Sequence, residues 1–403
     1  MKADIELIDR GEQVALMEPT RIGDGYRFRG RITDLALELA QKSAGFQRSL
    51  PAALMRSLAD LVRSMNCYYS NLIEGHDTHP VDIERALQND YSGDARKRDL
   101  QLEAKAHITV QKWIDEGGLP GVAATSVEGV CAIHRRFCEL LPEDLLWVES
   151  RTSGERLRVI PGEIRRRDVQ AGQHVAISAG ALPRFLERFS AVYGNLGKTE
   201  GILAVAAAHH RLLWMHPFLD GNGRVARLVS HAQLLRLLGT GGVWSVARGL
   251  ARNVEEYKRR LAECDLPRRN DLDGGGSLSE EALGAFTEFF LQVSLDQVTF
   301  MEGLMQPDRL RMRILRWAEE ETRMGALPAK SGLVLEAILY RGELARGDAD
   351  AIVGTGERQA RRIVSALVDR GVIASESTRA PLRMAFPAAF AGQWMPGLFP
   401  EAY

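Results

Sequence analysis

One twelve-residue segment gathers residue types suited to the chemistry of phosphate esters. Residues 216–227 have the sequence HPFLDGNGRVAR and lie between two apolar stretches that we expect to be helices. Gly221 and Gly223 let the backbone approach a ligand, and the start of the second helix offers an anion free N–H groups and the positive end of its dipole. Arg224 and Arg227, three residues apart, add two permanent cations that suit phosphate oxygens. The segment is therefore predicted to bind phosphate groups.

Asp220 and His216 indicate that a bound phosphate takes part in a reaction. Asp220 would add repulsion to a site for anions alone, but it suits a site where Mg²⁺ bridges the carboxylate and a phosphate. His216, expected one helical turn earlier, can accept a proton from an attacking hydroxyl near neutral pH. We therefore expect a transfer reaction of the phosphoryl type, promoted by positioning and charge stabilisation. The alternative is a simple tight turn, which would not require these residues together.

The bulk properties describe an ordinary globular protein. The length of 403 residues predicts two or three packed units, and the formal net charge of −1 gives no overall argument for binding nucleic acid or an anionic membrane. The first residues lack the apolar centre of a secretory signal, and no apolar run approaches the length of a membrane-spanning helix. We therefore expect a cytoplasmic location and no membrane association. The cysteines form no CxxC pair, which is typical of reduced thiols.

Apolar residues at three- and four-residue spacing predict a mainly α fold. One helix is expected over about 51–75, where Pro51 can open it and Gly75 can close it. Further helices are expected over residues 183–193, 199–215, 223–238 and 254–264. Residues 157–178 interrupt this pattern with β-branched residues and two turn signals, which predicts one exposed β-hairpin.

The last hundred residues have their own pattern. Short helices are expected over residues 333–344, 348–353 and 357–370, followed by a strand, turn and strand over 372–386. That order is typical of a winged helix, a variant of the helix-turn-helix. The third helix is expected to expose Arg358, Arg361 and Arg362, as a recognition helix in a DNA groove requires. DNA is therefore one candidate partner, and a merely solvated or core-packed face is the alternative.

The segment HPFLDGNGRVAR resembles the signature of the Fic (filamentation induced by cAMP) family. The resemblance implies that His216 is a general base, that Asp220 binds Mg²⁺, and that Asn222 and the loop amides form an anion hole. Arg224 and Arg227 would hold the phosphates of ATP. It further implies a protein adenylyltransferase, which moves AMP from ATP to a Ser, Thr or Tyr hydroxyl and releases pyrophosphate. The target would be another protein or the chain itself, and a homodimer is a family-based expectation.

Two further expectations depend on the same resemblance, which covers about residues 43–305. The predicted hairpin lies where the family carries a flap that holds a target segment by strand addition. Its candidate target-binding residues are Ile164, Val169, Val175 and Ile177. Asn253 and Tyr257 are candidates for the nucleoside end of the pocket.

Residues 70–75, with the sequence SNLIEG, resemble the inhibitory motif of the same family. A carboxylate such as Glu74 in the last turn of a helix faces the negative end of the dipole, which costs about 0.3–1 kcal/mol unless a cation compensates. The resemblance names Arg227 as that cation and Ser70 as the start of the motif. If Glu74 occupies Arg227, the γ-phosphate of ATP loses its clamp. His76 departs from the common pattern after Gly75.

These expectations divide the chain into three regions. They are an N-terminal helical region with the inhibitory helix (1–115), a Fic catalytic core with its flap (116–305), and a winged-helix domain (306–403). Two alternatives stay open for the function. The same site could remove AMP or transfer another phosphate or nucleotide group. Alternatively, the chain could be a transcriptional regulator that senses nucleotide and acts through the winged helix, although sensing would not require His216.

Overall fold

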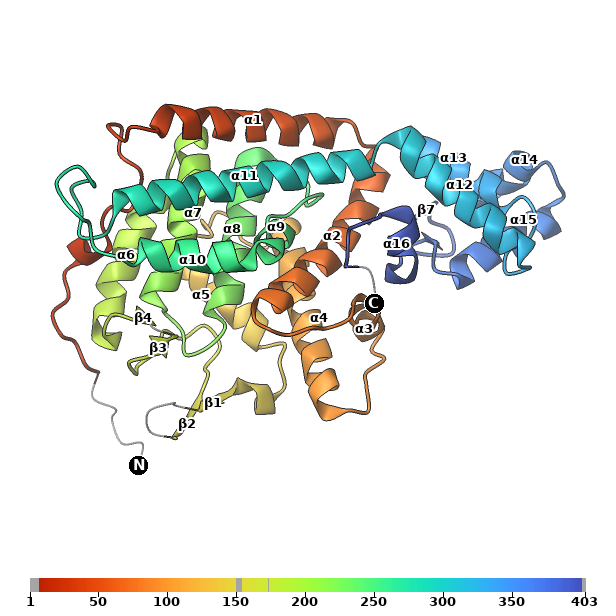
Figure 1. The fold of residues 1–403 in the computed structure, drawn as a ribbon. Helices are drawn as coiled ribbons and strands as arrows, with labels where there is room; N and C mark the ends of the chain where they lie inside the picture. The colour runs from red at the N-terminus through yellow and green to blue at the C-terminus, as the bar shows by residue number, and fades with distance from the viewer. Residues whose placement is uncertain (1–6, 150–153, 173, 401–403) are drawn as a thin grey trace.

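The computed structural model describes residues 7–149, 154–172 and 174–400. Helices dominate this part of the chain, and its strands are short, so the expected mainly α class is confirmed. Two antiparallel helices form the centre of the larger body (Figure 1), α7 (Lys198–Met215) and α8 (Asn222–Leu238). Most residues of both helices are buried, because neighbouring helices pack around them.

The helices around this central pair come from both ends of the sequence. The first long helix, α1, lies along α11 and also contacts α7, although about 250 residues separate α1 from α11 (Figure 1). Residues at the two ends of the body are therefore folded together. The surrounding helices are α1 (Arg29–Arg48), α5 (Val127–Cys138), α6 (Leu182–Tyr193), α9 (Ala247–Arg252), α10 (Val254–Cys264) and α11 (Glu280–Leu304).

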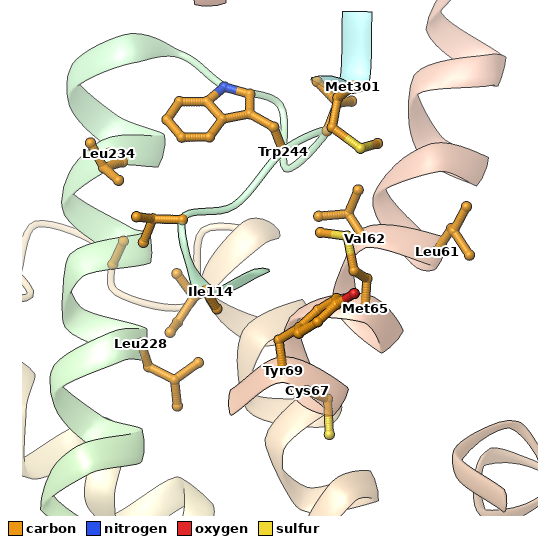
Figure 2. Close-up of a cluster of buried hydrophobic side chains, with 14 of the residues drawn as sticks. Leu61, Val62, Met65, Cys67, Tyr69, Ile114, Leu228, Leu234, Trp244 and Met301 are labelled. Carbon is orange, nitrogen blue, oxygen red and sulfur yellow. The ribbon is translucent and has the colours of Figure 1, made fainter. Parts of the chain in front are cut away.

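The helix expected over 51–75 is α2 (Ala52–Ile73), and it ends beside the start of α8. Its apolar face packs into the core with Leu228 and Leu234 of α8, Trp244 and Met301 (Figure 2). The indole N–H of Trp244 donates to Ser43 Oγ at 2.9 Å, so the buried ring keeps a polar partner. Two further helices follow α2 and contact it, α3 (Pro80–Leu87) and α4 (Ala95–Asp115).

A hairpin is present within the expected range of 157–178, but it is shorter than expected and covers only the end of that range. The structure has two separate antiparallel pairs, β1 (Trp147–Glu149) with β2 (Arg156–Arg158), and β3 (Gln170–Ala171) with β4 (His174–Val175). Leu157 pairs with Val148, which lies before the predicted segment. Residues between the two pairs lack strand pairing, and the buried side chain of Arg165 lies in this stretch.

The C-terminal unit has the expected order of helices and strands, with one addition. Its helices are α12 (Pro307–Arg323), α13 (Ser331–Arg341), α14 (Ala349–Val353) and α15 (Glu357–Asp369). Its strands β5 (Glu343–Leu344), β6 (Ile373–Ala374) and β7 (Leu382–Met384) form one antiparallel sheet in the order β5-β7-β6. The expected helix over 333–344 is too long, because Gly342 at φ 84° ends α13 and the next two residues pair with β7.

The chain then returns to α2. A short helix, α16 (Ala391–Trp394), packs on α12, with Trp394 edge-on to Trp317. Beyond it, Leu398 O accepts a 3.0 Å hydrogen bond from the Tyr69 hydroxyl of α2. The C-terminal segment therefore contacts and supports α2 directly (Figure 1).

Among the described residues, none of the helices combines the length and the hydropathy needed to cross a bilayer.

Candidate active site

The segment 216–227 forms the turn between α7 and α8. Helix α7 ends at Met215, and His216 follows with φ 50° and ψ 61°, a left-handed conformation that side-chain-bearing residues rarely adopt. His216 and Asp220 are therefore separated by a loop and not, as expected, by one helical turn. Gly221, at φ 79°, directs the chain into α8, whose first N–H groups have no intrahelical partners. The loop thus presents the predicted anion site.

Asn222 shapes this loop with its side chain. Its Oδ1 accepts from Phe218 N at 3.0 Å, and its Nδ2 donates to Phe218 O at 2.9 Å. Phe218 is fully buried and stacks on His134 of α5, with ring centroids 3.8 Å apart. Both polar atoms of the Asn222 side chain are therefore engaged inside the loop. The side chain holds the shape of the loop through its carbonyl oxygen and one N–H of its amide.

The α2 helix closes over Arg227. Arg227 is buried, and its guanidinium donates to Ser70 Oγ at 2.8 Å, Ser70 O at 3.3 Å and Glu74 Oε1 at 2.5 Å. Burial alone would raise the pKa of Glu74, but the charge and hydrogen bond of Arg227 outweigh it and lower that pKa. A side chain at Gly223 would displace the Glu74 carboxylate from this position, since a Cβ there would lie 2.3 Å from Glu74 Oε1. The structure thus joins both predicted halves, Ser70 with Glu74 and the glycine loop with Arg227.

Arg224 has a carboxylate partner that the sequence did not indicate. Its guanidinium donates to Glu103 of α4 and lies 3.3 Å from His76 Nδ1, while its Cζ is 5.5 Å from the centre of the Phe137 ring. Although burial opposes it, the His76 hydrogen bond and the Arg224 charge lower the pKa of Glu103. Both predicted phosphate clamps are therefore paired with carboxylates of the chain itself.

His216 is held in the neutral form. Burial lowers the pKa of its imidazole to about 4, and the Arg165 guanidinium acts in the same direction. Asp220 is exposed at the mouth of the loop, and no ion pair or hydrogen bond between described residues engages its carboxylate. A neutral imidazole and an exposed carboxylate thus lie at the loop that leads into α8.

Mg²⁺ fits the residues of this site when phosphates supply the other ligands. Within the described part of the chain, no group of three His, Cys, Asp or Glu side chains is placed to hold a metal ion by itself. Mg²⁺ commonly binds through one or two carboxylates together with substrate phosphates and water. Asp220 is the carboxylate that could take this role.

The predicted nucleoside residues lie in different surroundings. Tyr257 is buried, and its hydroxyl hydrogen-bonds with His209 Nε2 at 2.6 Å, while His209 Nδ1 hydrogen-bonds with Ser230 Oγ at 2.9 Å. Asn253 is exposed and donates to Gly249 O at 2.9 Å. The hydroxyl of Tyr257 is therefore already engaged behind the loop, and Asn253 is the more accessible of the two.

The predicted target-binding residues surround the β3–β4 hairpin. Val175 is exposed in β4, Ile164 and Val169 are half-buried, and Ile177 is buried in the core. Ile177 therefore anchors this segment, and Val175 is the residue most available to a target. In the C-terminal unit, Arg358, Arg361 and Arg362 are all exposed on α15, as expected.

Two residues near the loop, Arg165 and His134, do not stand out in the sequence. Arg165 lies in the run of three arginines at 165–167, which suggests a solvated strand, yet its side chain is fully buried. His134 belongs to α5, and only the folded chain stacks it under Phe218. No local pattern distinguishes either residue from its neighbours.

A helix N-terminus that is surrounded by a histidine, an acid and two arginines is an arrangement suited to bind an anion. Residues 124–234 match the model of the Fic/DOC family. The chain therefore contains a Fic/DOC family domain, which includes α7, the loop and most of α8.

Two insect proteins that share one name are similar to this chain in sequence. The chain is 26% identical over 219 residues to "Protein adenylyltransferase Fic" of Drosophila erecta, a match that covers 52% of this chain and 41% of the relative. A protein of the same name in Culex quinquefasciatus is 36% identical over 99 residues, covering 23% of this chain and 19% of the relative. The matches thus span less than half the length of these relatives.

Two solved structures share the fold. A Fic family protein from Desulfovibrio desulfuricans G20 superimposes with a TM-score of 0.50 at 17% identity, covering 88% of this chain and 95% of that one. Fic-1 (residues 134–508) from C. elegans gives a TM-score of 0.51 at 16% identity, covering 69% and 73% of the two chains. The helical bundle expected from the sequence is therefore a Fic fold.

Proposed function

We propose that this chain is a protein adenylyltransferase that its own α2 helix holds in an inhibited state. The observation that carries the proposal is the convergence at the start of α8. Neutral His216, the available Asp220 and the arginines Arg224 and Arg227 all surround one glycine loop. A binding site for phosphate alone would need neither the base nor the acid.

The proposed reaction uses each of these groups. A hydroxyl of the target attacks the α-phosphorus of ATP, and His216 accepts its proton. A new O–P bond forms, the bond to the bridging oxygen between the α- and β-phosphorus atoms breaks, and pyrophosphate leaves. The loop N–H groups and the arginines stabilise the charge on the phosphates. Mg²⁺, when bound at Asp220, would neutralise part of that charge.

Two further observations support the regulatory part of the proposal. Glu74 occupies Arg227, so the cation proposed to clamp the γ-phosphate is already neutralised. Gly223 leaves the space that this contact requires. Release of Glu74 would therefore free both the charge and the room that a triphosphate needs. The β3–β4 hairpin beside the loop is the proposed platform for the target segment, with Val175 exposed on it.

Labelled ATP tests this proposal directly. We expect Glu74→Gly to increase label transfer to a protein target or to the chain itself, by about 10- to 100-fold if it removes one charge-assisted hydrogen bond of about 1.5–3 kcal/mol. The added change His216→Ala should abolish transfer. Glu116→Gly is the matched control, because Glu116 caps α4 and precedes a glycine just as Glu74 caps α2.

The outcomes separate this activity from its alternatives. Equal labelling of all variants would contradict the mechanism. A mass increase on the target that differs from that of AMP would identify another transferred group. Loss of AMP from a previously modified target, requiring Glu74, would indicate removal as the function of the same site.

We also propose that the unit over residues 306–403 contains a winged helix that binds DNA. Its support is the exposed arginine face of α15, with Arg358, Arg361 and Arg362, beside a three-stranded sheet. Glu357 pairs with Arg361 at 2.7 Å, so part of this charge is already balanced. A gel-shift assay with duplex DNA at falling salt tests it, since phosphate contacts weaken steeply as salt rises. An unchanged shift in a variant with Arg358 and Arg362 replaced by Ala would contradict it.

A further inference from the structure

Arg165 is a buried arginine, and the groups that accept its side-chain hydrogen bonds are backbone carbonyls. Its side chain is fully shielded from solvent, and the nearest carboxylate, that of Asp168, lies 3.9 Å away. Burying a guanidinium costs several kcal/mol unless its donors are satisfied. A buried guanidinium is explained when its hydrogen bonds hold other parts of the backbone in position.

The guanidinium of Arg165 connects two segments. On one side, Nε donates to His216 O at 2.7 Å and Nη2 lies 3.4 Å from Met215 O. On the other side, Nη1 donates to Arg167 O at 2.8 Å and Nη2 donates to Ile177 O at 2.6 Å. The first pair of carbonyls is the end of α7, and the second pair flanks the β3–β4 hairpin. The backbone N–H of Arg165 adds a third link, to Pro217 O at 2.9 Å.

This contact coincides with the unusual backbone of His216. A left-handed residue with a side chain costs on the order of 1–3 kcal/mol and persists only where its surroundings determine it. The carbonyls at the end of α7 also carry the negative end of the helix dipole, and a buried cation satisfies them. Arg165 supplies both the cation and the geometry.

We propose that Arg165 is a positioning residue for group transfer, which fixes His216 relative to the β3–β4 hairpin. The inference depends on the roles proposed above for His216 and for the hairpin. A target strand bound along the hairpin would present its hydroxyl at a set distance from the imidazole, because one guanidinium holds both. Small errors in such an arrangement are costly, since a misplacement of about 1 Å can reduce the rate about 100-fold.

The charge of Arg165 has a second consequence for the imidazole. After burial, Arg165 is the largest of the influences that lower the pKa of His216, with His174 of β4 acting in the same direction and Glu74 opposing both. Replacing Arg165 with a neutral residue should therefore raise that pKa. Arg165→Lys keeps the charge but has one nitrogen in place of three, so it separates geometry from charge.

The kinetic test uses the full chain with Glu74→Gly as the parent. We expect Arg165→Met to lower kcat about 100-fold with less than a threefold change in the KM for ATP, and to shift the acid limb of the pH profile upward. Arg165→Lys should lower kcat without moving the acid limb. Arg211→Lys is the control, because Arg211 is equally buried in α7 and donates to Pro19 O at 2.7 Å, away from the loop. Its kcat should stay within threefold of the parent.

A second measurement does not depend on activity. The imidazole signal of His216 in ¹³C-labelled protein, assigned by its loss in His216→Ala, should shift in Arg165→Met and titrate at a higher pH. If the parent transfers no AMP but this shift occurs, the proposed activity fails and the positioning role stands. An unchanged signal and unchanged kcat in cooperatively folded Arg165→Met and Arg165→Lys would overturn the inference. If Arg165→Met does not fold, Arg165→Lys decides it in the same way.

Discussion

At the scale of single residues, the two arginines of the loop differ in how they are held. Arg227 is paired with a residue at the end of α2, whereas Arg224 is paired with Glu103 in the middle of α4. Release of α2 alone would therefore leave Arg224 engaged. In the proposed function, Glu103 would be a second carboxylate that competes with the phosphates of ATP.

This pairing predicts the effect of Glu103 on nucleotide affinity. In a Glu74→Gly parent, we expect Glu103→Gln to lower the Kd for ATP by about 10-fold, the equivalent of about 1.4 kcal/mol, because Arg224 loses an ionic competitor. Isothermal titration calorimetry measures this without a transfer step. Glu128→Gln, an exposed change on α5, is the control and should leave the Kd unchanged. Weaker binding by Glu103→Gln would show instead that Glu103 holds Arg224 in place for ATP.

The lowered pKa of His216 predicts the pH dependence of transfer. Burial and Arg165 hold this pKa at about 4, so the imidazole stays free to accept a proton down to that pH. We expect kcat/KM of the Glu74→Gly variant to change less than about twofold between pH 8 and pH 6, where an ordinary histidine would lose about three quarters of its neutral form. A half-maximal rate near pH 6.5 would contradict the assignment.

At the scale of elements, the apolar pattern predicted the helices well. Helices α2, α6, α7, α8 and α10 begin and end within a residue or two of the expected ranges, because each buries a face or is enclosed by the core. The loop residues could also be found, since they are adjacent in sequence. The residues that contact the loop from other helices could not be found from the sequence. Glu103 and His134 reach it from α4 and α5, and only tertiary packing decides which of many carboxylates and histidines arrives there.

Contacts of the hairpin and of the C-terminal segment could not be predicted from the sequence either. Arg165 is one of three consecutive arginines, and the interior selects it through carbonyls at positions 177, 215 and 216. The segment after Met384 has few local signals, yet it forms α16 and contacts α2. Long-range contacts of this kind leave no periodicity in the sequence.

The contact between the C-terminal segment and α2 bears on the proposed inhibition. The hydroxyl of Tyr69, one residue before Ser70, donates to Leu398 O, and Arg248 of α9 donates to Gly397 O at 2.7 Å. Leu398 itself is fully buried. Loosening this segment should therefore weaken the hold of Glu74 on Arg227.

We therefore expect Leu398→Ala to increase AMP transfer in a chain that keeps Glu74. Its control is Leu367→Ala in α15, because both leucines are fully buried and each truncation should cost about 2–5 kcal/mol of stability. Transfer should rise with Leu398→Ala and stay at the parent level with Leu367→Ala, at a temperature where both variants are folded. Equal transfer by the two variants would show that the segment does not restrain α2.

At the scale of the whole molecule, buried histidines set the acid stability. Burial lowers the pKa of five imidazoles well below 6.5. They are His107 and His209, at about 3, and His134, His210 and His216, at about 4. Between pH 6.5 and 4 the unfolded chain binds protons at these positions and the folded chain does not. The free energy of unfolding therefore falls as the pH is lowered through this range, by about 1.4 kcal/mol per pH unit for each histidine.

His107 allows this to be tested with one substitution. It is fully buried in α4, and neither ring nitrogen has a hydrogen-bond partner among the described residues. His107→Leu removes one imidazole that resists protonation, so urea unfolding at pH 6.5, 6, 5.5 and 5 should show a slope smaller by about 1.4 kcal/mol per pH unit in the lower part of that range. The variant should also keep or gain stability near pH 6, because an apolar side chain leaves no buried polar group without a partner. A slope equal to that of the parent would mean that His107 binds its proton in the folded protein.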